Sequence, residues 1–473
     1  MATSTTATEL WRIGASDLAQ LIRSRELTSR EVVEAHLARI AAVNPALNAI
    51  TVTLTDTALA AAEAADRELA AGGEVGPLHG VPVTVKENID LTGSATTQGI
   101  VAMEQAVPEI DAPHMAQIKA AGAIPIGRTN LPDFGLRWHS DNALRGATKN
   151  PWDASRTPGG SSGGEAAALA TGMTPLGMGN DYGGSLRWPS QCCGTAALKP
   201  TLGRIAQASA LAPEEATITL QMFAVQGPMA RHARDLRLAF ENMSGPDPRD
   251  SWWVPAPLRG PEAPKRAALT IDPAGEGVDA EVAAGVRRAA DALRDAGWEV
   301  VEIDPPNVSW ARDMWGGLVR YEVEAGFVPV LQQLGGADAN RFLEIGLGGM
   351  PKLDAMGYVR GLADREGLAR EWSQFSAEYP VTLGPVTTMQ AFPVGFDLEG
   401  PDEIQQLLRG FRLIVAANLL GLPVAVVNAG IGAQSGLPQG VQLIGARFRE
   451  DLCLDAAEAI EERLGIVTPI DPR

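Results

Sequence analysis

The chain has 473 residues, of which 45% are hydrophobic and 20% are charged, and its formal net charge is −18. This composition is typical of a soluble globular protein that is large enough to bury a sizeable core. The negative charge argues against nucleic acid or an anionic membrane surface as a partner, because both repel an acidic protein.

Cysteine usage and the start of the chain bear on the compartment. The three cysteines, Cys192, Cys193 and Cys453, have no regular spacing, which predicts neither a disulfide framework nor a zinc site. We expect Cys192 and Cys193 to be buried thiols. Residues 1–20 show no basic segment followed by an apolar one, so no secretory signal is expected. These features predict a cytoplasmic protein, either a monomer or a homodimer.

Helices and strands are predicted to alternate along much of the chain. In chain order, we expect helices over 16–24, 28–42 and 56–71, a strand over 81–85, a helix over 112–122, a strand over 123–127, a helix over 165–173, a strand–helix–strand unit over 267–271, 279–296 and 299–303, and helices over 405–420 and 450–464. This alternation predicts an α/β fold with a parallel or mixed sheet covered by helices. Residues 203–267 show no clear pattern. Since no repeat or low-complexity linker interrupts the chain, we expect one catalytic domain over 1–473.

The longest uncharged run, residues 413–435, is about long enough to span a bilayer. Asn418, Gly421 and Pro423 interrupt it, which favours the end of a helix, a turn and a buried strand over 424–427. We therefore expect no membrane span.

Two glycine–serine clusters stand out, at residues 156–165 and 179–189, with Ser161 and Ser185 at their centres. Glycines beside a serine let the backbone approach a ligand with its N–H groups exposed, which suits an oxyanion or a phosphate. A phosphate cradle is not supported, because no Gly-x-x-x-x-Gly-Lys-Ser/Thr motif occurs and Glu165 would repel phosphate.

Residues 159–163 satisfy the Gly-x-Ser-x-Gly pattern of a serine hydrolase, which needs a histidine later in the chain. His232 is the only histidine after Ser161, and we expect His114 and His139 to be loop or surface residues. A triad with histidine is therefore not predicted, and a serine nucleophile needs another base.

Lysine is the remaining candidate for the base, and the chain has only six lysines. A lysine in an apolar pocket has a lowered pKa, so its neutral amine becomes available. Lys86 ends a strand in which Val81, Val83 and Val85 alternate, so its side chain points to the opposite face. Its amine either reaches solvent or is held inside; Lys199 is the second candidate.

At this point the sequence resembles the amidase signature family. The resemblance is continuous over residues 78–204 and weaker towards both ends. The motifs that carry it, in order, are LHGVPVTVKEN from residue 78, GRTN from 127, GATKNPW from 146, GGSSGG from 159, DYGGSLRWP from 181, CGTAALKPT from 193 and GLPQGVQLIG from 436.

The resemblance implies that family's fold, a large mixed β-sheet covered on both faces by helices, and its Ser–Ser–Lys triad. Ser185 would be the acyl-forming nucleophile, Ser161 the bridging serine on an unusual cis peptide, and Lys86 the neutral base. The chemistry would need neither a metal nor an organic cofactor, and the partner would be a small-molecule amide. The backbone N–H groups that would form the oxyanion hole belong to Tyr182, Gly183, Gly184 and Ser185.

Other residues near the motifs have supporting roles by the same resemblance. Asp181 and Arg187 would fix the loops around the oxyanion hole, and Ser162 would hydrogen-bond the glycine-rich loop. Leu136 and Trp138 fall where some members line the acyl pocket.

The sequence departs from the family pattern at two of these positions. Tyr182 replaces a smaller residue and is expected to narrow the pocket, and Glu165 replaces a commoner small residue. Residues 205–380 carry no motif, and we expect them to determine the substrate.

The function predicted from the resemblance is the hydrolysis of carboxylic amides or of near relatives such as hydrazides. The alternative is the glutaminase (A) subunit of a tRNA-dependent amidotransferase. Residues 313–327 lack the tyrosine- and arginine-rich pattern of that subunit, which favours a free-standing hydrolase.

Overall fold

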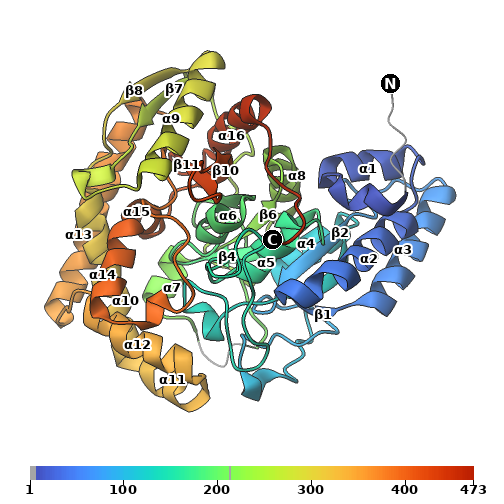
Figure 1. The fold of residues 1–473 in the computed structure, drawn as a ribbon, viewed down its shortest axis with the longest axis horizontal. Coiled ribbons are helices and arrows are strands. Elements are labelled where there is room, and N and C mark those ends of the chain that lie inside the picture. Colours follow the sequence, from blue (N-terminus) through green and yellow to red (C-terminus); the bar gives the residue numbers. More distant parts are fainter. Residues whose placement is uncertain (1–6, 212–214) are drawn as a thin grey trace.

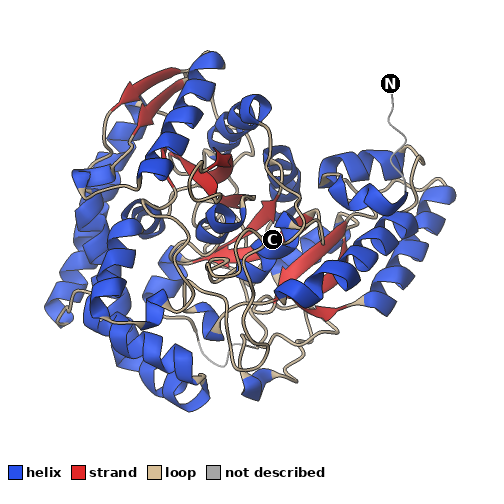
Figure 2. Cartoon of the chain, in the orientation of Figure 1, coloured by secondary structure: helices blue, strands red, loops and turns tan. Residues whose placement is uncertain are grey.

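The structure is a computed structural model that describes residues 7–211 and 215–473. Within these residues, eleven strands form one mixed sheet in the order β1-β3-β2-β4-β6-β5-β10-β11-β9-β7-β8. The strands are β1 (Ile50–Thr53), β2 (Pro82–Lys86), β3 (Ile124–Thr129), β4 (Leu176–Asp181), β5 (Ala196–Lys199), β6 (Val225–Ala230), β7 (Arg266–Leu269), β8 (Glu299–Glu302), β9 (Val381–Pro385), β10 (Val424–Ile431) and β11 (Pro438–Gly445). Figure 2 shows this sheet running through the molecule between layers of helix, so the predicted α/β class is confirmed.

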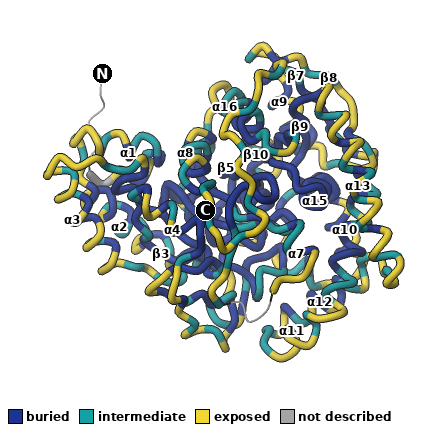
Figure 3. The backbone as a smooth tube through the Cα atoms, turned by 180° about the vertical axis from the view of Figure 1, so that it is seen from behind, coloured by how far each residue is buried: buried dark blue, intermediate teal, exposed yellow. Residues whose placement is uncertain are grey.

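Helices cover both faces of the sheet (Figure 1). They are α1 (Ala15–Arg23), α2 (Ser29–Leu47), α3 (Thr55–Ala70), α4 (Pro113–Ala120), α5 (Gly163–Ala170), α6 (Arg187–Cys193), α7 (Ile218–Phe223), α8 (Ala233–Met243), α9 (Ala280–Asp295), α10 (Val308–Glu322), α11 (Val328–Leu334), α12 (Ala337–Gly349), α13 (Ala355–Glu378), α14 (Pro401–Gly410), α15 (Arg412–Leu420) and α16 (Glu450–Leu464). Two large apolar clusters form the core, one on each face, and Figure 3 shows the buried interior that they fill.

The two faces of β2 separate its apolar and polar side chains. Val83 and Val85 pack with Val81 into the cluster that contains α4 and α8. Thr84 and Lys86 face the opposite side, where their side chains bond residues of the chain around α5. This is the alternation that the sequence predicts for a half-buried strand, except that all five residues of β2 are buried.

The position of β2 brings three strand ends together. β2 pairs in parallel with β3 on one side and with β4 on the other. Because the carboxyl ends of parallel strands lie at the same edge of a sheet, Thr129, Lys86 and Asp181 end side by side. The two glycine–serine clusters lie close to this edge, since α5 follows one cluster and β4 enters the other.

The predicted helix over 405–420 is wrong in one respect, because the structure has two helices there, α14 and α15. The break lies at Phe411, and the carbonyl of Gly410 accepts a hydrogen bond of 3.0 Å from Thr388 N–H. At Gly410 a Cβ would lie 2.8 Å from Met389 Sδ, so the chain turns where the backbone packs closely.

The stretch 203–267, which shows no clear sequence pattern, contains α7, β6 and α8. β6 pairs antiparallel with β4, and both strands are rich in glycine. A Cβ at Gly227 would collide with the carbonyl oxygen of Leu198. Close packing therefore requires glycines that lower the local β-propensity and hide the strands from pattern reading.

Two histidines lie deeper than the sequence predicts. His114 and His139, expected in loops or at the surface, are each 1% exposed. Cys192 and Cys193 are buried free thiols, as expected. In the described part of the chain, the helices are too short or too polar to cross a membrane, and the run 413–435 forms the end of α15 and the strand β10.

Candidate active site

Lys86 ends β2 with its side chain completely buried, at 0% exposure. Its Nζ lies 2.6 Å from Ser161 Oγ and 2.7 Å from Asn180 Oδ1. Burial lowers the pKa of Lys86 to about 7, although Asp181 and Glu165 act in the opposite direction. A neutral amine is therefore accessible near physiological pH, and the possibility that Lys86 reaches solvent is excluded.

Asn180 orients this amine. An amide oxygen only accepts hydrogen bonds, so Lys86 must donate an N–H to Asn180 Oδ1. The amide of Asn180 is itself fixed, since its Nδ2 donates to Asn88 Oδ1 at 2.9 Å. When Lys86 is neutral, this leaves the lone pair of its nitrogen free to accept the proton of the Ser161 hydroxyl.

Ser161 lies in a glycine-rich loop that neighbouring backbone holds tightly. The Gly160–Ser161 peptide is cis, as the resemblance implies. A Cβ at Gly160 would lie 2.4 Å from the carbonyl oxygen of Arg137, so only glycine fits. Ser140 Oγ closes the loop by donating to the carbonyl of Gly159 at 3.0 Å and accepting from Gly163 N–H at 3.0 Å.

Ser185 lies beside this loop and is 7% exposed. Its carbonyl accepts a hydrogen bond of 3.2 Å from Ser162 N–H, which links the two glycine–serine clusters. The hydroxyl groups of Ser185 and Ser161 share no hydrogen bond in this structure. Hydrogen bonds used in catalysis often shorten only when substrate is bound, so the arrangement remains compatible with proton transfer between them.

Asp181 and Arg187 form a buried ion pair beneath the loop that carries Ser185. Arg187 Nε and Nη2 each lie 2.9 Å from a carboxylate oxygen of Asp181. Burial alone would raise the pKa of Asp181, but Arg187 holds it well below its usual range. Asn418 of α15 donates to the same carboxylate at 2.9 Å. Both residues therefore fix the loop, as the sequence predicts.

The same carboxylate engages one of the predicted oxyanion donors. The N–H of Gly184 donates to Asp181 Oδ1 at 2.8 Å. Gly184 has φ +104°, and a Cβ there would lie 2.8 Å from Ile414 Cγ2, so glycine is required. The donors of the loop that Asp181 leaves free are the N–H groups of Tyr182, Gly183 and Ser185.

Aromatic rings enclose the oxyanion loop. Trp138 Nε1 donates to the carbonyl of Gly183 at 3.1 Å, so Trp138 orients the peptide between Gly183 and Gly184. On the other side, a Cβ at Gly183 would lie 2.7 Å from the Trp315 ring of α10. The ring of Tyr182 packs against Trp315 and Phe223, with centroid distances of 5.9 and 6.4 Å.

Leu136 and Trp138, the predicted pocket residues, lie in one loop that passes Ser161. A Cβ at Gly135 in this loop would lie 3.2 Å from Ser161 Oγ. Leu136 is half-buried against the apolar cluster of α11 and α12, whereas Trp138 is 5% exposed. Both are therefore near the site, but Trp138 contacts the backbone of the oxyanion loop.

Two sequence predictions need correction. Ser162 Oγ is buried without a hydrogen-bond partner among the described residues, so its hydroxyl does not bond the glycine-rich loop; its N–H does the linking instead. Lys199 is buried, and burial lowers its pKa to about 7, but its Nζ donates to the carbonyls of Pro200 and Leu422. It contacts no serine of the triad, so geometry excludes it as the base.

Asn180, Asn88 and Ser140 are the polar residues of the site that the sequence reading missed. Asn180 immediately precedes Asp181 within a motif that the sequence does single out, so its place at the end of β4 was the available signal. Ser140 and Asn88 lie in loops whose path depends on tertiary packing.

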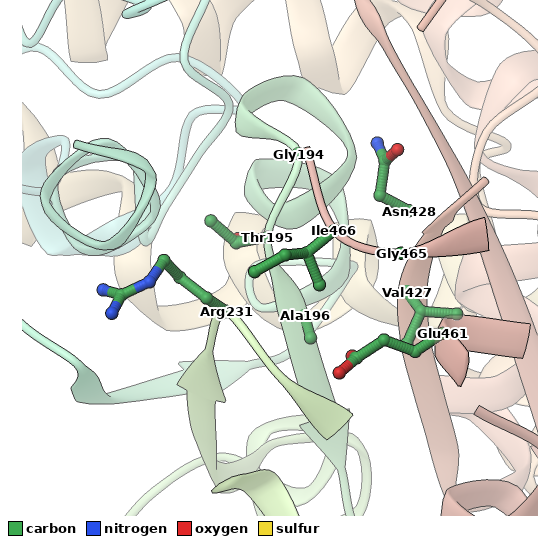
Figure 4. Close-up of a pocket in the computed structure, with 9 residues that line it drawn as sticks. All are labelled: Gly194, Thr195, Ala196, Arg231, Val427, Asn428, Glu461, Gly465 and Ile466. Carbon is green, nitrogen blue, oxygen red and sulfur yellow. The ribbon is translucent and has the colours of Figure 1, made fainter. Parts of the chain in front are cut away.

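A small cavity of about 10 Å³ lies away from these residues (Figure 4). Figure 4 shows Arg231 and Asn428 at its margin with their polar groups turned in different directions, so it forms no convergent site. A larger hollow of about 630 Å³ lies between α11 and α12. Across residues 7–211 and 215–473, no three histidine, cysteine, aspartate or glutamate side chains are placed to hold a metal ion.

A family model described as Amidase matches residues 31–454 of the chain. The chain belongs to the amidase family. An indoleacetamide hydrolase of Bradyrhizobium diazoefficiens is 43% identical over 97% of this chain and 88% of its own length. The glutaminase-type (A) component of a glutamyl-tRNA(Gln) amidotransferase from an Anaeromyxobacter species is 34% identical over 99% of this chain and 100% of its own length.

Solved structures of this family share the fold of the amidase described here. A 6-aminohexanoate cyclic dimer hydrolase with bound substrate has a TM-score of 0.82 and 28% identity, covering 98% of this chain and 99% of its own. A bacterial aryl acylamidase of the amidase signature family has a TM-score of 0.82 and 25% identity, covering 95% of this chain and 96% of its own. The family and fold predicted from the motifs are therefore confirmed.

The ion pair beneath the oxyanion loop yields a stability prediction. Asp181→Asn leaves the buried guanidinium of Arg187 without its counter-charge, which we expect to destabilise the fold by ~3–5 kcal/mol. Urea unfolding measures this loss. Asp291→Asn is the control, because its ion pair with Arg294 is exposed and should contribute ~0–1 kcal/mol. Equal effects of the two substitutions would contradict the structural role of Asp181.

Proposed function

We propose that this amidase hydrolyses the carboxamide of a small molecule with an aromatic acyl group, through an acyl-enzyme on Ser185. The observation that carries the proposal is the contact between the fully buried amine of Lys86 and Ser161 Oγ. A buried lysine with a hydroxyl group at 2.6 Å is suited to accept a proton, because burial disfavours its charged form.

In the first half of the reaction, Ser185 Oγ attacks the amide carbonyl carbon. Its proton passes to Ser161 while Ser161 gives its own proton to Lys86. The negative charge that develops on the substrate oxygen is stabilised by the N–H groups of Tyr182, Gly183 and Ser185. As the C–N bond breaks, the proton returns through Ser161 to the leaving nitrogen, and the amine or ammonia departs.

In the second half, water attacks the acyl group on Ser185. The same relay takes a proton from the water molecule and returns it to Ser185 Oγ, which releases the carboxylic acid. Every proton moves between groups of this chain, substrate and water, so the steps balance without an added cofactor.

Support for an aromatic acyl group comes from the walls of the site. Trp315 and Tyr182 lie against the oxyanion loop, and α10, which carries Trp315, belongs to the region 205–380 that the sequence leaves without motifs. The relative that is named an indoleacetamide hydrolase supports the same class of substrate. We propose that this region selects the acyl group while the whole chain acts as one catalytic unit.

The substrate is tested with a panel of amides. We expect kcat/KM for indole-3-acetamide to exceed that for acetamide by at least about 10²-fold, since burying an aromatic group contributes a few kcal/mol. Ammonia release measures the rates. Activity confined to glutamine, or activity that needs a second protein chain, would instead favour the amidotransferase alternative.

The nucleophile is tested with Ser185→Ala. We expect kcat to fall at least about 10⁴-fold, because the acyl-enzyme cannot form, and Lys86→Ala to reduce it severely. Circular dichroism and the unfolding midpoint establish that both variants fold. Turnover near the wild-type rate in the Ser185→Ala protein would overturn the mechanism.

The base predicts a pH profile. Lys86 works only when neutral, and its pKa is lowered to about 7, so kcat/KM should rise through about pH 7 and level off above it. We expect no effect of a chelator on this profile. A maximum below pH 6, or loss of activity with EDTA that zinc restores, would point to a different base or to a metal.

A further inference from the structure

Glu165 is a completely buried carboxyl group that the hydrolytic steps do not use. It is the third residue of α5, which begins directly after Ser161 and Ser162. Its Oε2 accepts a hydrogen bond of 2.8 Å from Thr129 Oγ1, and its Oε1 accepts one from Thr84 Oγ1.

The register of the sheet places these two threonines around Lys86. Thr84 precedes Lys86 by two residues in β2 and so faces the same side, and Thr129 is its direct neighbour across β3. Gly177 of β4 pairs with Thr84, and a Cβ there would occupy the place of the Glu165 carboxyl group. The carboxyl group therefore fills a slot on the face of the sheet where the base lies.

Lys86 is the charged group that acts on Glu165. The titratable side chains on the elements packed against α5 are Lys86 on β2, Arg128 on β3, Asp181 on β4, and Arg187, Cys192 and Cys193 on α6. Asp181 and Arg187 neutralise each other, and burial raises the pKa of both cysteine thiols. Arg128 directs its Nη2 to the carbonyls of Lys86 and Ile89.

We propose that Glu165 is a positioning residue that sets the pH at which Lys86 becomes a working base. The inference rests on the proposed role of Lys86. The carboxyl group acts through its charge and not by contact with substrate. Because the site excludes water, a charge one step along the sheet is weakly screened.

The protons of the two groups exchange over the same pH range. Burial raises the pKa of Glu165 to about 7, against the hydrogen bonds from Thr84 and Thr129 and the charge of Lys86. Burial lowers that of Lys86 to about 7. The acid limb of the pH profile therefore belongs to the pair. Ionised Glu165 stabilises protonated Lys86, so removing this charge makes the amine neutral at lower pH.

The test compares two isosteric substitutions at buried carboxyl groups. Glu165→Gln keeps a side chain that can bond both threonines but removes the charge. Glu450→Gln is the matched control: Glu450 is 1% exposed, accepts from Thr201 N–H at 2.8 Å, and raises the pKa of the other buried lysine, Lys199. Lys199 lies outside the relay, so this variant should keep the wild-type acid limb.

Two readouts separate this inference from the proposed substrate. The first is kcat/KM for indole-3-acetamide against pH. The second is the rate at which a fluorophosphonate probe labels Ser185 against pH. In that reaction Ser185 Oγ bonds to phosphorus, the P–F bond breaks, fluoride leaves, and the proton passes through Ser161 to Lys86. The probe needs the relay but no particular amide.

We expect Glu165→Gln to move the acid limb down by about one pH unit, the low end of the effect of a nearby opposite charge. An unmoved limb, an upward shift, or an equal shift in Glu450→Gln would overturn the proposal. If Glu165→Gln does not fold, Thr129→Val serves in its place: the carboxylate loses a donor, ionises less, and the limb should again move down. Wild-type labelling at Ser185 without hydrolysis of any amide would refute the proposed function alone.

Discussion

The hydrogen bond between Lys86 Nζ and Ser161 Oγ joins the end of a strand to a glycine-rich loop 75 residues further along the chain. A lysine with no exposed surface is costly unless its amine is neutral or well bonded, so the surroundings must supply donors and acceptors with care. Asn180 accepts one N–H, and the peptide geometry around Ser161 fixes where its hydroxyl lies. The neighbouring strands β3 and β4 hold all of these groups in place.

Glycine makes this arrangement possible. At Gly160, Gly177 and Gly183 a side chain would collide with a backbone segment, a carboxyl group or an indole ring. Each glycine therefore allows a close approach that brings a functional group to the base, the relay or the oxyanion loop. The same glycines lower the local strand propensity, which explains why β4 and β6 are weak in sequence but firm in the sheet.

Much of the site was predictable because its residues lie in ordered motifs. The alternation of Val81, Val83 and Val85 predicted the face of Lys86, and the elimination of histidine predicted a lysine base. Asn180 was not predicted, because the sequence does not reveal which side chain meets a buried amine. The role of Trp138 was predicted only as pocket lining; its indole N–H on Gly183 depends on a loop path that no local pattern encodes. The break at Phe411 likewise comes from packing between distant segments.

The ion pair of Asp181 and Arg187 has a consequence for biosynthesis. Asn418 donates to Asp181, and Arg187 donates to the carbonyl of Ile414, both from α15 near the end of the chain. A nascent chain that has just emerged beyond β4 already contains the lysine and both serines, yet it lacks the groups that complete the support of the oxyanion loop. The reactive serine is therefore assembled late, and hydrolytic competence is a property of the finished chain.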